Sequence, residues 1–386
     1  MINLSDLRGR ILSAIIGLYT IFQVIINTSI VNETQNAQLV YRISVILLIL
    51  VALAVLLNTD YIVRDFRNAI FFLVALSITF IIFCSHGYNN IIFAFWMPFM
   101  ALSIGIKKVL KIDFVCRFFV FLCIILLAQI GIISNGNIID GSSGRLRYAL
   151  GFSNPNSVSQ IVLALLIEVL ILNGGQLFRK NVMFVVLTSG VITFFSRSRT
   201  AIALVVTLLV VNMIVSKCKK QILRFPLIKM FFFLIPIVCL ILSYWIVKRY
   251  LINPDELIQY LDTIMSGRIH FAAYYFQHFP INGFGNNFIT QQSIGSTVTT
   301  NYGALDNGYL SLLVRFGYVV TGVFITAYSI CCWKIASNEK YIFLIPGVLI
   351  MLLLGLSETV FYFGAYNVTL YCLCVLMRHK GEVIDE

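Results

Sequence analysis

The sequence predicts an all-α polytopic membrane protein with about 12 transmembrane helices, and three observations support this. First, 60% of the 386 residues are hydrophobic and only 11% are charged, whereas soluble domains carry about 25% charged residues. Second, mean hydropathy is +0.94, and apolar stretches of about 20 residues, long enough to cross the hydrocarbon core, recur along the chain. Third, basic residues gather in every second loop between these stretches, that is, on one side of the membrane. Residues 1–386 are therefore expected to form a single transmembrane domain.

Twelve apolar stretches are the expected spans. In chain order they are Ile11–Ile30, Val40–Leu57, Ala69–Cys84, Ile91–Ile106, Phe114–Ile133, Asn156–Leu172, Val182–Phe195, Ala201–Val215, Leu227–Val247, Leu310–Trp333, Tyr341–Leu356 and Val360–Met377. Several are shorter than the usual length of about 17 residues. The polar breaks are briefest within Ala69–Ile106 and within Val182–Val215.

The positions of Lys and Arg predict that both termini are cytoplasmic. With an even number of spans, every segment on the same side of the membrane as the N-terminus is basic. The basic residues of these segments are Arg8, Arg10, Arg64, Arg67, Lys107, Lys108, Lys111, Arg179, Lys180, Lys217, Lys219, Lys220, Arg224, Lys334, Lys340, Arg378 and Lys380. The opposite loops Val31–Ala37 and Ser85–Asn90 contain no Lys or Arg. This is the pattern of the positive-inside rule. It also accounts for the net charge of +12 without a nucleic-acid partner.

Two segments on the outer side are longer than the other loops. One comprises residues 134–153, and the other comprises residues 248–306 and precedes the last three spans. A short amphipathic helix is expected near Gly267–Phe279, because Pro280 and Asn282-Gly283 then signal turns. Its aromatic residues suit the membrane interface.

Five arginines break the charge rule on the outer side. They are Arg145 and Arg147 in the first long loop, Arg197 and Arg199 in a short turn, and Arg268 in the large loop. Arginines on the outer side of the membrane oppose the expected topology. Binding of an anion would compensate for that cost, since the guanidinium fork donates two parallel hydrogen bonds to a phosphate. A structural alternative is that Arg197 or Arg199 pairs with Glu358 or with lipid headgroups.

Four further charged residues fall inside or near the apolar spans: Arg42, Arg117, Arg315 and Glu168. Intramembrane charge is a functional hypothesis by default. Arg42 and Arg117 lie close enough to span ends for their side chains to reach the headgroups, and we favour that interpretation. Glu168 lies deep in its span, where it either pairs structurally or lines a polar cavity.

Several short motifs occur in a fixed order on the outer side. They are Gly151–Asn156 after Arg147, Ser198–Thr200, Ser266–Arg268 followed by Ile281–Gly285, and Asp306–Leu310 leading to Phe316-Gly317. This order, with a long outer loop before the last helices, resembles the superfamily of O-antigen polymerases (Wzy) and O-antigen ligases (WaaL). The resemblance extends from about Arg145 to Gly317.

The resemblance implies a GT-C-like, metal-independent glycosyltransferase without a cofactor, in the plasma (inner) membrane of a bacterium. A polymerase of this kind joins undecaprenyl-pyrophosphate-linked oligosaccharide repeat units on the outer face, making capsule, O-antigen or exopolysaccharide. Its expected partners are that lipid-linked substrate, membrane lipids, a flippase and a chain-length regulator. The family's motif arginines correspond to Arg147, Arg199 and Arg268. Where ligases typically carry a histidine, this chain carries Asp306.

The residues support the same reaction on chemical grounds. When a sugar hydroxyl displaces a lipid pyrophosphate, negative charge develops on the leaving group, and preorganised arginines stabilise it. No Asp-x-Asp motif or convincing metal-ligand set is present in the sequence, so a metal ion is not required. Asp306 is either a base for the acceptor hydroxyl or an N-cap of the following helix.

Other candidates for substrate binding have structural alternatives of similar weight. Asn154 and Asn156 can bind sugar hydroxyls, but beside Pro155 they equally fit the cap of a helix. His270 and His278 flank the aromatic helix and are either a base or interfacial residues. Tyr274 can stack on a sugar ring or anchor the helix at the interface.

Two rival functions remain open from the sequence. A ligase would move the glycan to a different acceptor, which the sequence does not encode legibly. A transporter or flippase would place its charges near the middle of the membrane on broken helices. The unusual arginines instead gather at the outer surface beside a long loop, which favours chemistry at that surface.

Overall fold

The computed structural model describes residues 4–33, 37–86, 90–139, 146–176, 183, 186–187, 189–190, 196–287 and 305–377. These residues are mostly helical, with one antiparallel hairpin that pairs β1 (Ile138–Ile139) with β2 (Leu146–Arg147). Helices suit a bilayer because they satisfy every backbone hydrogen-bonding group within the segment.

The helices follow one another with few long connections. In chain order they are α1 (Leu4–Ile25), α2 (Ser29–Glu33), α3 (Ala37–Leu57), α4 (Thr59–Arg64), α5 (Phe66–His86), α6 (Ile91–Met100), α7 (Ile106–Gln129), α8 (Pro155–Leu172), α10 (Arg199–Lys217), α11 (Lys219–Arg224), α12 (Pro226–Ile252), α13 (Glu256–Ile264), α14 (Arg268–His278), α15 (Gly308–Ser311), the π-helix η1 (Leu312–Phe316), α16 (Gly317–Ala336), η2 (Ile342–Leu344), α17 (Ile345–Leu354), η3 (Thr359–Tyr362) and η4 (Val368–Leu376).

Seven spans in the described part of the chain are long and apolar enough to cross a membrane. They are Asp6–Ile25, Leu39–Leu57, Phe66–His86, Pro155–Leu172, Arg199–Lys217, Pro226–Ile252 and Gly308–Ala336. They confirm a polytopic membrane protein, while the total of 12 spans stays a prediction. The span expected at Val182–Phe195 and the candidate Arg145 lie largely or wholly outside the described residues.

The final expected span is not a single α-helix. Within Val360–Met377 the chain forms two 3₁₀ helices, η3 and η4, separated at Gly364 and Asn367. Asn367 breaks the helix because its side chain accepts from the backbone of Thr369 and donates to the carbonyl oxygen of Phe361. Since η4 is buried against α6, α7 and α16, side-chain packing rather than lipid surrounds this segment.

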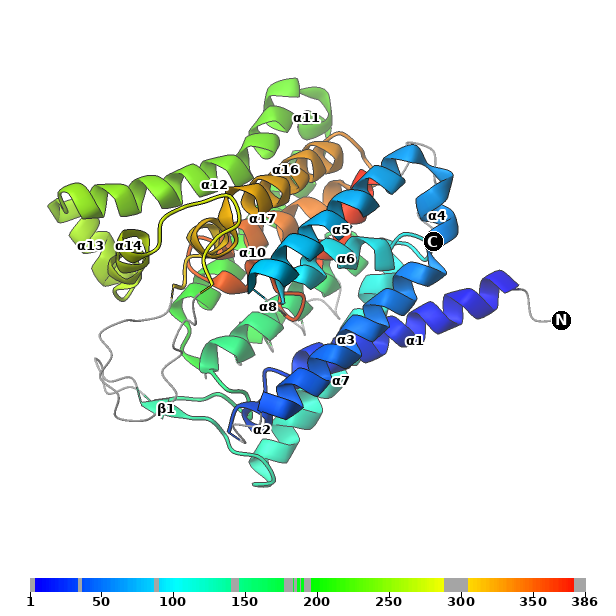
Figure 1. Cartoon of the computed structure of the whole chain (residues 1–386), viewed down its shortest axis with the longest axis horizontal. Coiled ribbons are helices and arrows are strands. Elements are labelled where there is room, and N and C mark those ends of the chain that lie inside the picture. The colour runs from blue at the N-terminus through cyan, green and yellow to red at the C-terminus, as the bar shows by residue number, and fades with distance from the viewer. Residues whose placement is uncertain are drawn as a thin grey trace.

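Helix α8 is the centre of the bundle. In its apolar window 89% of the residues are buried, against 17% for α5 and 28% for α12, and it packs on α7, α10 and α17. In Figure 1, α13, α14 and β1 lie at the left and α4 and the first turn of α1 lie at the right. The helices between them run from one end to the other, so the described parts of the two long connecting segments, residues 134–153 and 248–306, share one end of the molecule.

A turn at residues 282–286 closes a break in the last long span. The backbone N–H of Asn286 donates to the carbonyl oxygens of Val314 and Arg315, at 3.1 and 3.0 Å, and that of Tyr318 donates to Asn282 at 3.0 Å. A Cβ at Gly285 would lie 2.0 Å from the Arg315 carbonyl oxygen. This close backbone contact explains why glycine occupies that position of the Ile281–Gly285 motif.

The expectation that Arg117 reaches the headgroups is wrong. Its side chain is 1% exposed and lies in the core, with its Nη2 2.6 Å from Asp113 Oδ2 and its Nε 3.9 Å from Glu168 Oε2. Thr20 donates to Asp113 at 2.5 Å, and Arg117 donates to the Ala365 carbonyl oxygen. Glu168 lies in the same buried cluster, where its contact with Arg117 is at the limit of ion-pair distance and neither of its oxygens has a hydrogen-bond partner among the described residues. Arg42, in contrast, is exposed.

Candidate functional site

Arg268 is the centre of a charged cluster at the end of the bundle where α14 lies. It is the first residue of α14, after Ser266 and Gly267, whose φ angles of 58° and 79° turn the chain sharply. The Arg268 guanidinium lies 3.3 Å from Asp306 through Nε and 2.9 Å from Glu358 through Nη2. Its Nη1 donates to the Ser357 carbonyl oxygen. One arginine therefore holds together α14 and two segments far along the chain.

Asp306 is not the helix cap that the sequence allowed. Asn307 caps α15, because its Oδ1 accepts from the Leu310 N–H at 3.0 Å. The Asn307 amide also donates to Ser243 and to the Leu356 carbonyl oxygen. With Asn307 fixed, the neighbouring Asp306 carboxylate points to Arg268 and keeps 33% of its side chain exposed. It is therefore accessible to a ligand.

Glu358 is a site residue that the sequence analysis did not select. It follows α17, and the backbone beside it is held by a hydrogen bond of 2.8 Å from the Gly308 N–H to the Gly355 carbonyl oxygen. Its side chain is 9% exposed. The sequence signal was a lone carboxylate between two strongly apolar stretches, and we had considered it only as a partner for Arg197 or Arg199. It pairs with Arg268 instead.

Arg147 supplies a second cation to the same cluster. It ends β2, its Nε donates to the Ser196 carbonyl oxygen at 3.3 Å, and its Nη2 donates to Asn156 Oδ1. The Arg147 charge also favours the ionised form of Glu358. The charges of two arginines expected to bind substrate thus both act on one carboxylate, although the two are 121 positions apart in the chain.

Burial shifts the titration of both carboxylates in the cluster. It raises the pKa of Glu358 to about 7, with the Asp306 charge adding to the rise and Arg268 and Arg147 opposing it. Burial also raises the pKa of Asp306, against the attraction of Arg268. A carboxylate with a pKa near neutral can exchange a proton at physiological pH, as a general base must.

Arg199 and Arg197 are exposed at the start of α10, beside the cluster. Ser198 caps this helix, with its Oγ accepting from the Ala201 N–H at 3.4 Å. Arg197 has a φ angle of 49°, which is unusual for a residue other than glycine. Because Ser196 accepts from Arg147, the turn that carries both exposed arginines lies next to Arg147.

The remaining candidates have structural contacts of their own. Asn154 caps α8, since its Oδ1 accepts from the Asn156 N–H at 2.8 Å. Tyr250 Oη lies 3.1 Å from His270 Nδ1, and the ring of Tyr274 stacks on His278 at a centroid distance of 4.0 Å. Of this group, Asn156 touches the arginine cluster directly.

Arg315 is a further cation near this end of the bundle. It lies in η1, where the helix break described above occurs, and its Nε is buried without a hydrogen-bond partner among the described residues. Burial raises the pKa of Tyr275 on α14, and the Arg315 charge acts in the opposite direction. The sequence placed Arg315 in or near a span but did not assign it to the site.

These features define a class: a polytopic membrane protein with a cluster of arginines and carboxylates at one end of its helices. The sequence model of a protein family described as O-antigen ligase matches residues 184–325. That match confirms the resemblance to the O-antigen ligase and polymerase superfamily, over less than half of the chain. The matched stretch includes Arg199, Arg268 and Asp306, whereas Arg147 precedes it. A comparison with curated proteins finds no match.

Proposed function

We propose that this protein is a polysaccharide polymerase of the plasma membrane. It transfers a growing glycan from undecaprenyl pyrophosphate to a sugar hydroxyl of the next lipid-linked repeat unit, on the outer face. The observation that carries the proposal is the pairing of Arg268 with both Asp306 and Glu358. Arg147, whose charge also acts on Glu358, lies next to an exposed turn with two more arginines.

The arginines bind and stabilise the leaving diphosphate. In the transfer, a bond forms between the acceptor oxygen and the anomeric carbon, and the bond from that carbon to the pyrophosphate oxygen breaks. Negative charge then grows on the diphosphate, where Arg199 and Arg147 donate hydrogen bonds and Arg268 lies behind them. Such preorganised donors stabilise developing charge strongly, and the guanidinium geometry matches phosphate oxygens.

The two carboxylates handle the acceptor hydroxyl. One of the pair accepts the proton that the hydroxyl loses, and the other keeps Arg268 in place. Glu358 suits the first task because its pKa is about 7, so it is half ionised near neutral pH. Asn156, which already contacts Arg147, is placed to bind a sugar hydroxyl. Arg145, Arg197, His270 and Tyr274 are kept as candidates for contacts to more distant sugars.

Metal independence is part of the proposal. Among the described residues, no group of three His, Cys, Asp or Glu side chains is placed to hold a metal ion. Arginines supply the positive charge in the mechanism above, so its steps need no cation from outside. A flippase that delivers the repeat units and a chain-length regulator are the expected protein partners, and the product is a capsule, an O-antigen or an exopolysaccharide.

A ligase is the second candidate, because the matched family carries that description. It would use the same arginines on the same donor and differ only in its acceptor, such as a lipid core. The presence of Asp306 where ligases typically have a histidine favours the polymerase. A transporter is less well supported, since the accessible charges lie at the end of the helices.

Sizing the products of the purified protein separates these functions. The protein is incubated with lipid-linked repeat units alone, and the glycans are resolved on a gel. A polymerase gives a ladder, while a ligase gives chains only after a second acceptor is added, and a transporter gives neither. Arg199→Ala and Arg268→Ala should both abolish the ladder.

Arg249→Ala is the matched control, because Arg249 is also an outer arginine but pairs with the exposed Asp255 at 2.5 Å. It should keep the full ladder. A ladder of normal length from both the Arg199 and Arg268 variants would overturn the proposal.

A further inference from the structure

A cavity of about 1490 Å³ lies at the end of the bundle opposite the candidate site. Residues from α1, α3, α4 and α7 line it, together with Leu172 at the last turn of α8. Asn156, at the first turn of α8, touches the arginine cluster. Sixteen residues of helix separate the two, or about 24 Å at 1.5 Å per residue. The cavity is therefore a separate feature from the site described above.

One side of this cavity is strongly cationic. Arg8, Lys107, Lys108 and Lys111 line it, and Asp60 is the one carboxylate among its described lining residues. Asp60 lies 2.9 Å from Arg8 Nη1 but is 81% exposed, and exposed pairs of this kind neutralise little. The cavity thus keeps an excess of positive charge.

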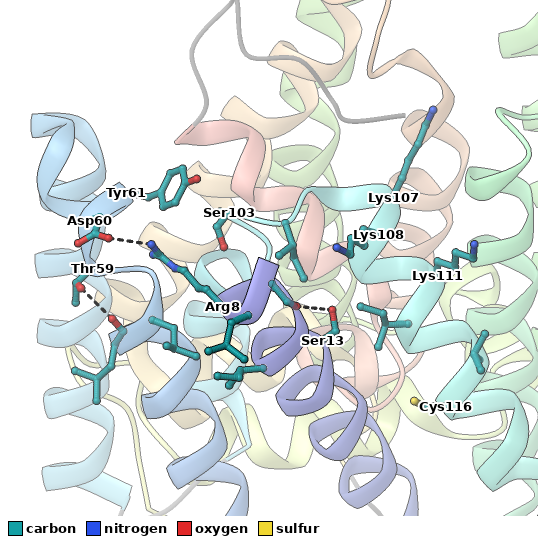
Figure 2. Close-up of a pocket in the computed structure, with 18 of the residues that line it drawn as sticks. Arg8, Ser13, Thr59, Asp60, Tyr61, Ser103, Lys107, Lys108, Lys111 and Cys116 are labelled. Carbon is teal, nitrogen blue, oxygen red and sulfur yellow. Dashed lines mark hydrogen bonds and ion pairs between the residues drawn. The ribbon is translucent and has the colours of Figure 1, made fainter. Parts of the chain in front are cut away.

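The Arg8 side chain has unused donors at the cavity. Its Nε and Nη2 atoms are buried and have no hydrogen-bond partner among the described residues. Figure 2 shows Arg8 on α1, with Asp60 and Tyr61 on one side and Lys108 of α7 on the other. A Cβ at Gly9 would lie 3.9 Å from Lys108 Nζ, so the small glycine leaves the ammonium close to α1. Buried donors without partners cost free energy, and an anion would satisfy them.

The rest of the cavity is apolar and exposed. Leu7, Ile11, Leu56 and Val115 line it with exposed fractions of 44%, 42%, 63% and 56%. Side chains of this kind gain most from contact with hydrocarbon. The cavity therefore presents cations to a headgroup and apolar walls to acyl chains, which is a combination that anionic lipids match.

We propose that this cavity binds an anionic phospholipid from the leaflet on the N-terminal side of the membrane, which we expect to be cytoplasmic. The phosphate diester accepts from Arg8 Nε and Nη2 and from the Lys108 ammonium. The acyl chains lie against Leu7, Ile11 and Leu56. Arginine suits this role because two of its N–H groups can reach one phosphate. The inference is independent of the proposed glycosyltransferase function.

Native mass spectrometry of the full chain in detergent tests the proposal. The protein is titrated with phosphatidylglycerol, with phosphatidylcholine of equal chain length, and with glycerol phosphate, which has no acyl chains. Phosphatidylglycerol should remain bound at concentrations where phosphatidylcholine and glycerol phosphate do not. Equal retention of the two lipids would overturn the proposal, and so would binding of glycerol phosphate as tight as that of the lipid.

Two kinds of variant locate the lipid. Arg8→Gln with Lys108→Gln should weaken phosphatidylglycerol binding by at least tenfold, since each basic residue near an anionic headgroup contributes about a fivefold preference. Ile11→Trp fills the apolar part without changing charge and should also weaken it. Lys220→Gln is the matched control, because Lys220 is an exposed basic residue that does not line the cavity.

The control should change phosphatidylglycerol binding by less than about twofold. Equal losses in Lys220→Gln and in the Arg8 and Lys108 double variant would show diffuse attraction to a basic surface and would overturn the proposal. Thermal unfolding of each variant without added lipid checks that it is folded. If the double variant is unfolded, Ile11→Trp alone decides the outcome. Weaker binding of phosphatidylglycerol to this variant supports the proposal, and unchanged binding overturns it.

Discussion

Two clusters in the described part of the chain each centre on an arginine that lies within ion-pair distance of two carboxylates. In the core, Arg117 pairs with Asp113 and Glu168, and all three side chains are at most 1% exposed. At the end of the bundle that we propose is the outer one, Arg268 pairs with Asp306 and Glu358, which are 33% and 9% exposed. The residue types are alike, but the surroundings are not.

The difference lies in what is left for a ligand. Arg117 donates its hydrogen bonds to the Asp113 carboxylate and to the Ala365 carbonyl oxygen. Thr20 donates a further hydrogen bond to Asp113. The outer cluster is partly open and has exposed arginines beside it at the start of α10. Charge in a membrane protein therefore indicates function only when it is accessible; a closed cluster fastens helices together.

The largest expected effect is on stability in the core cluster. Arg117→Leu leaves the Asp113 carboxylate buried without its cation, which costs about 3–5 kcal/mol. We expect little folded protein, measured as the yield of a monodisperse species in detergent. Arg117→Leu combined with Asp113→Asn removes the carboxylate charge closest to Arg117 and should recover part of that yield. A single variant as stable as the double variant would contradict the assignment of a charge-pairing role.

The next effect is on catalysis at the outer cluster. Glu358→Gln should slow glycan transfer by about 10²–10⁴-fold, the usual contribution of a general base. In the unaltered protein the rate should fall as pH drops below about 7, because burial raises the pKa of Glu358 to about 7 and protonation removes the base. The initial rate of ladder formation between pH 5 and 9 measures this.

Asp306→Asn should shift that acid limb to lower pH. The Asp306 charge is one of the causes that raise the Glu358 pKa, so its removal lets Glu358 ionise more easily. An acid limb that disappears in Asp306→Asn but persists in Glu358→Gln would assign the base to Asp306 instead.

A smaller effect is expected from Arg268→Lys. Lysine presents a single ammonium and cannot reach Asp306, Glu358 and the Ser357 carbonyl oxygen together. The transfer rate should fall by about 10²-fold, while the midpoint of thermal unfolding stays close to that of the unaltered protein. Full activity in this variant would mean that Arg268 acts only as a point charge.

The smallest effect is expected from Glu168→Gln. One arginine cannot neutralise two buried carboxylates, so replacing Glu168 by a neutral side chain of equal size leaves the Arg117–Asp113 pair at 2.6 Å intact. The free energy of unfolding should change by about 1 kcal/mol or less, and the transfer rate should be unaltered. A loss as large as that of Arg117→Leu would show that Glu168 is essential to the core cluster.

Hydropathy and charge predicted much of the fold because they are local properties. The expected span Asn156–Leu172 agrees with α8 (Pro155–Leu172) to within a residue, and the helix expected near Gly267–Phe279 coincides with α14. The two 3₁₀ helices were not predicted, since Asn367 breaks the helix through contacts with Phe361 and other groups that hydropathy does not reveal.

Tertiary pairing explains what the sequence missed in the charged clusters. Arg117 was assigned to the headgroups although its close partner Asp113 lies only four positions away, because the sequence does not reveal that both side chains face the core. Glu358 was not selected because nothing local joins it to Arg268. Motif order predicted that Arg147 and Arg268 act at one site, and the charges of both act on Glu358. The substrate-binding roles of all these residues stay predictions.

The helix break at η1 has a consequence for how such proteins can diversify. Asn286 is tied to Val314 and Arg315, and Leu305 packs on Leu310 and Val314, so both ends of the intervening stretch are anchored to one short piece of backbone. Insertions or deletions between positions 287 and 305 would leave Asp306 and Arg268 where they are. Changes of length in this stretch are therefore compatible with an intact Arg268 cluster.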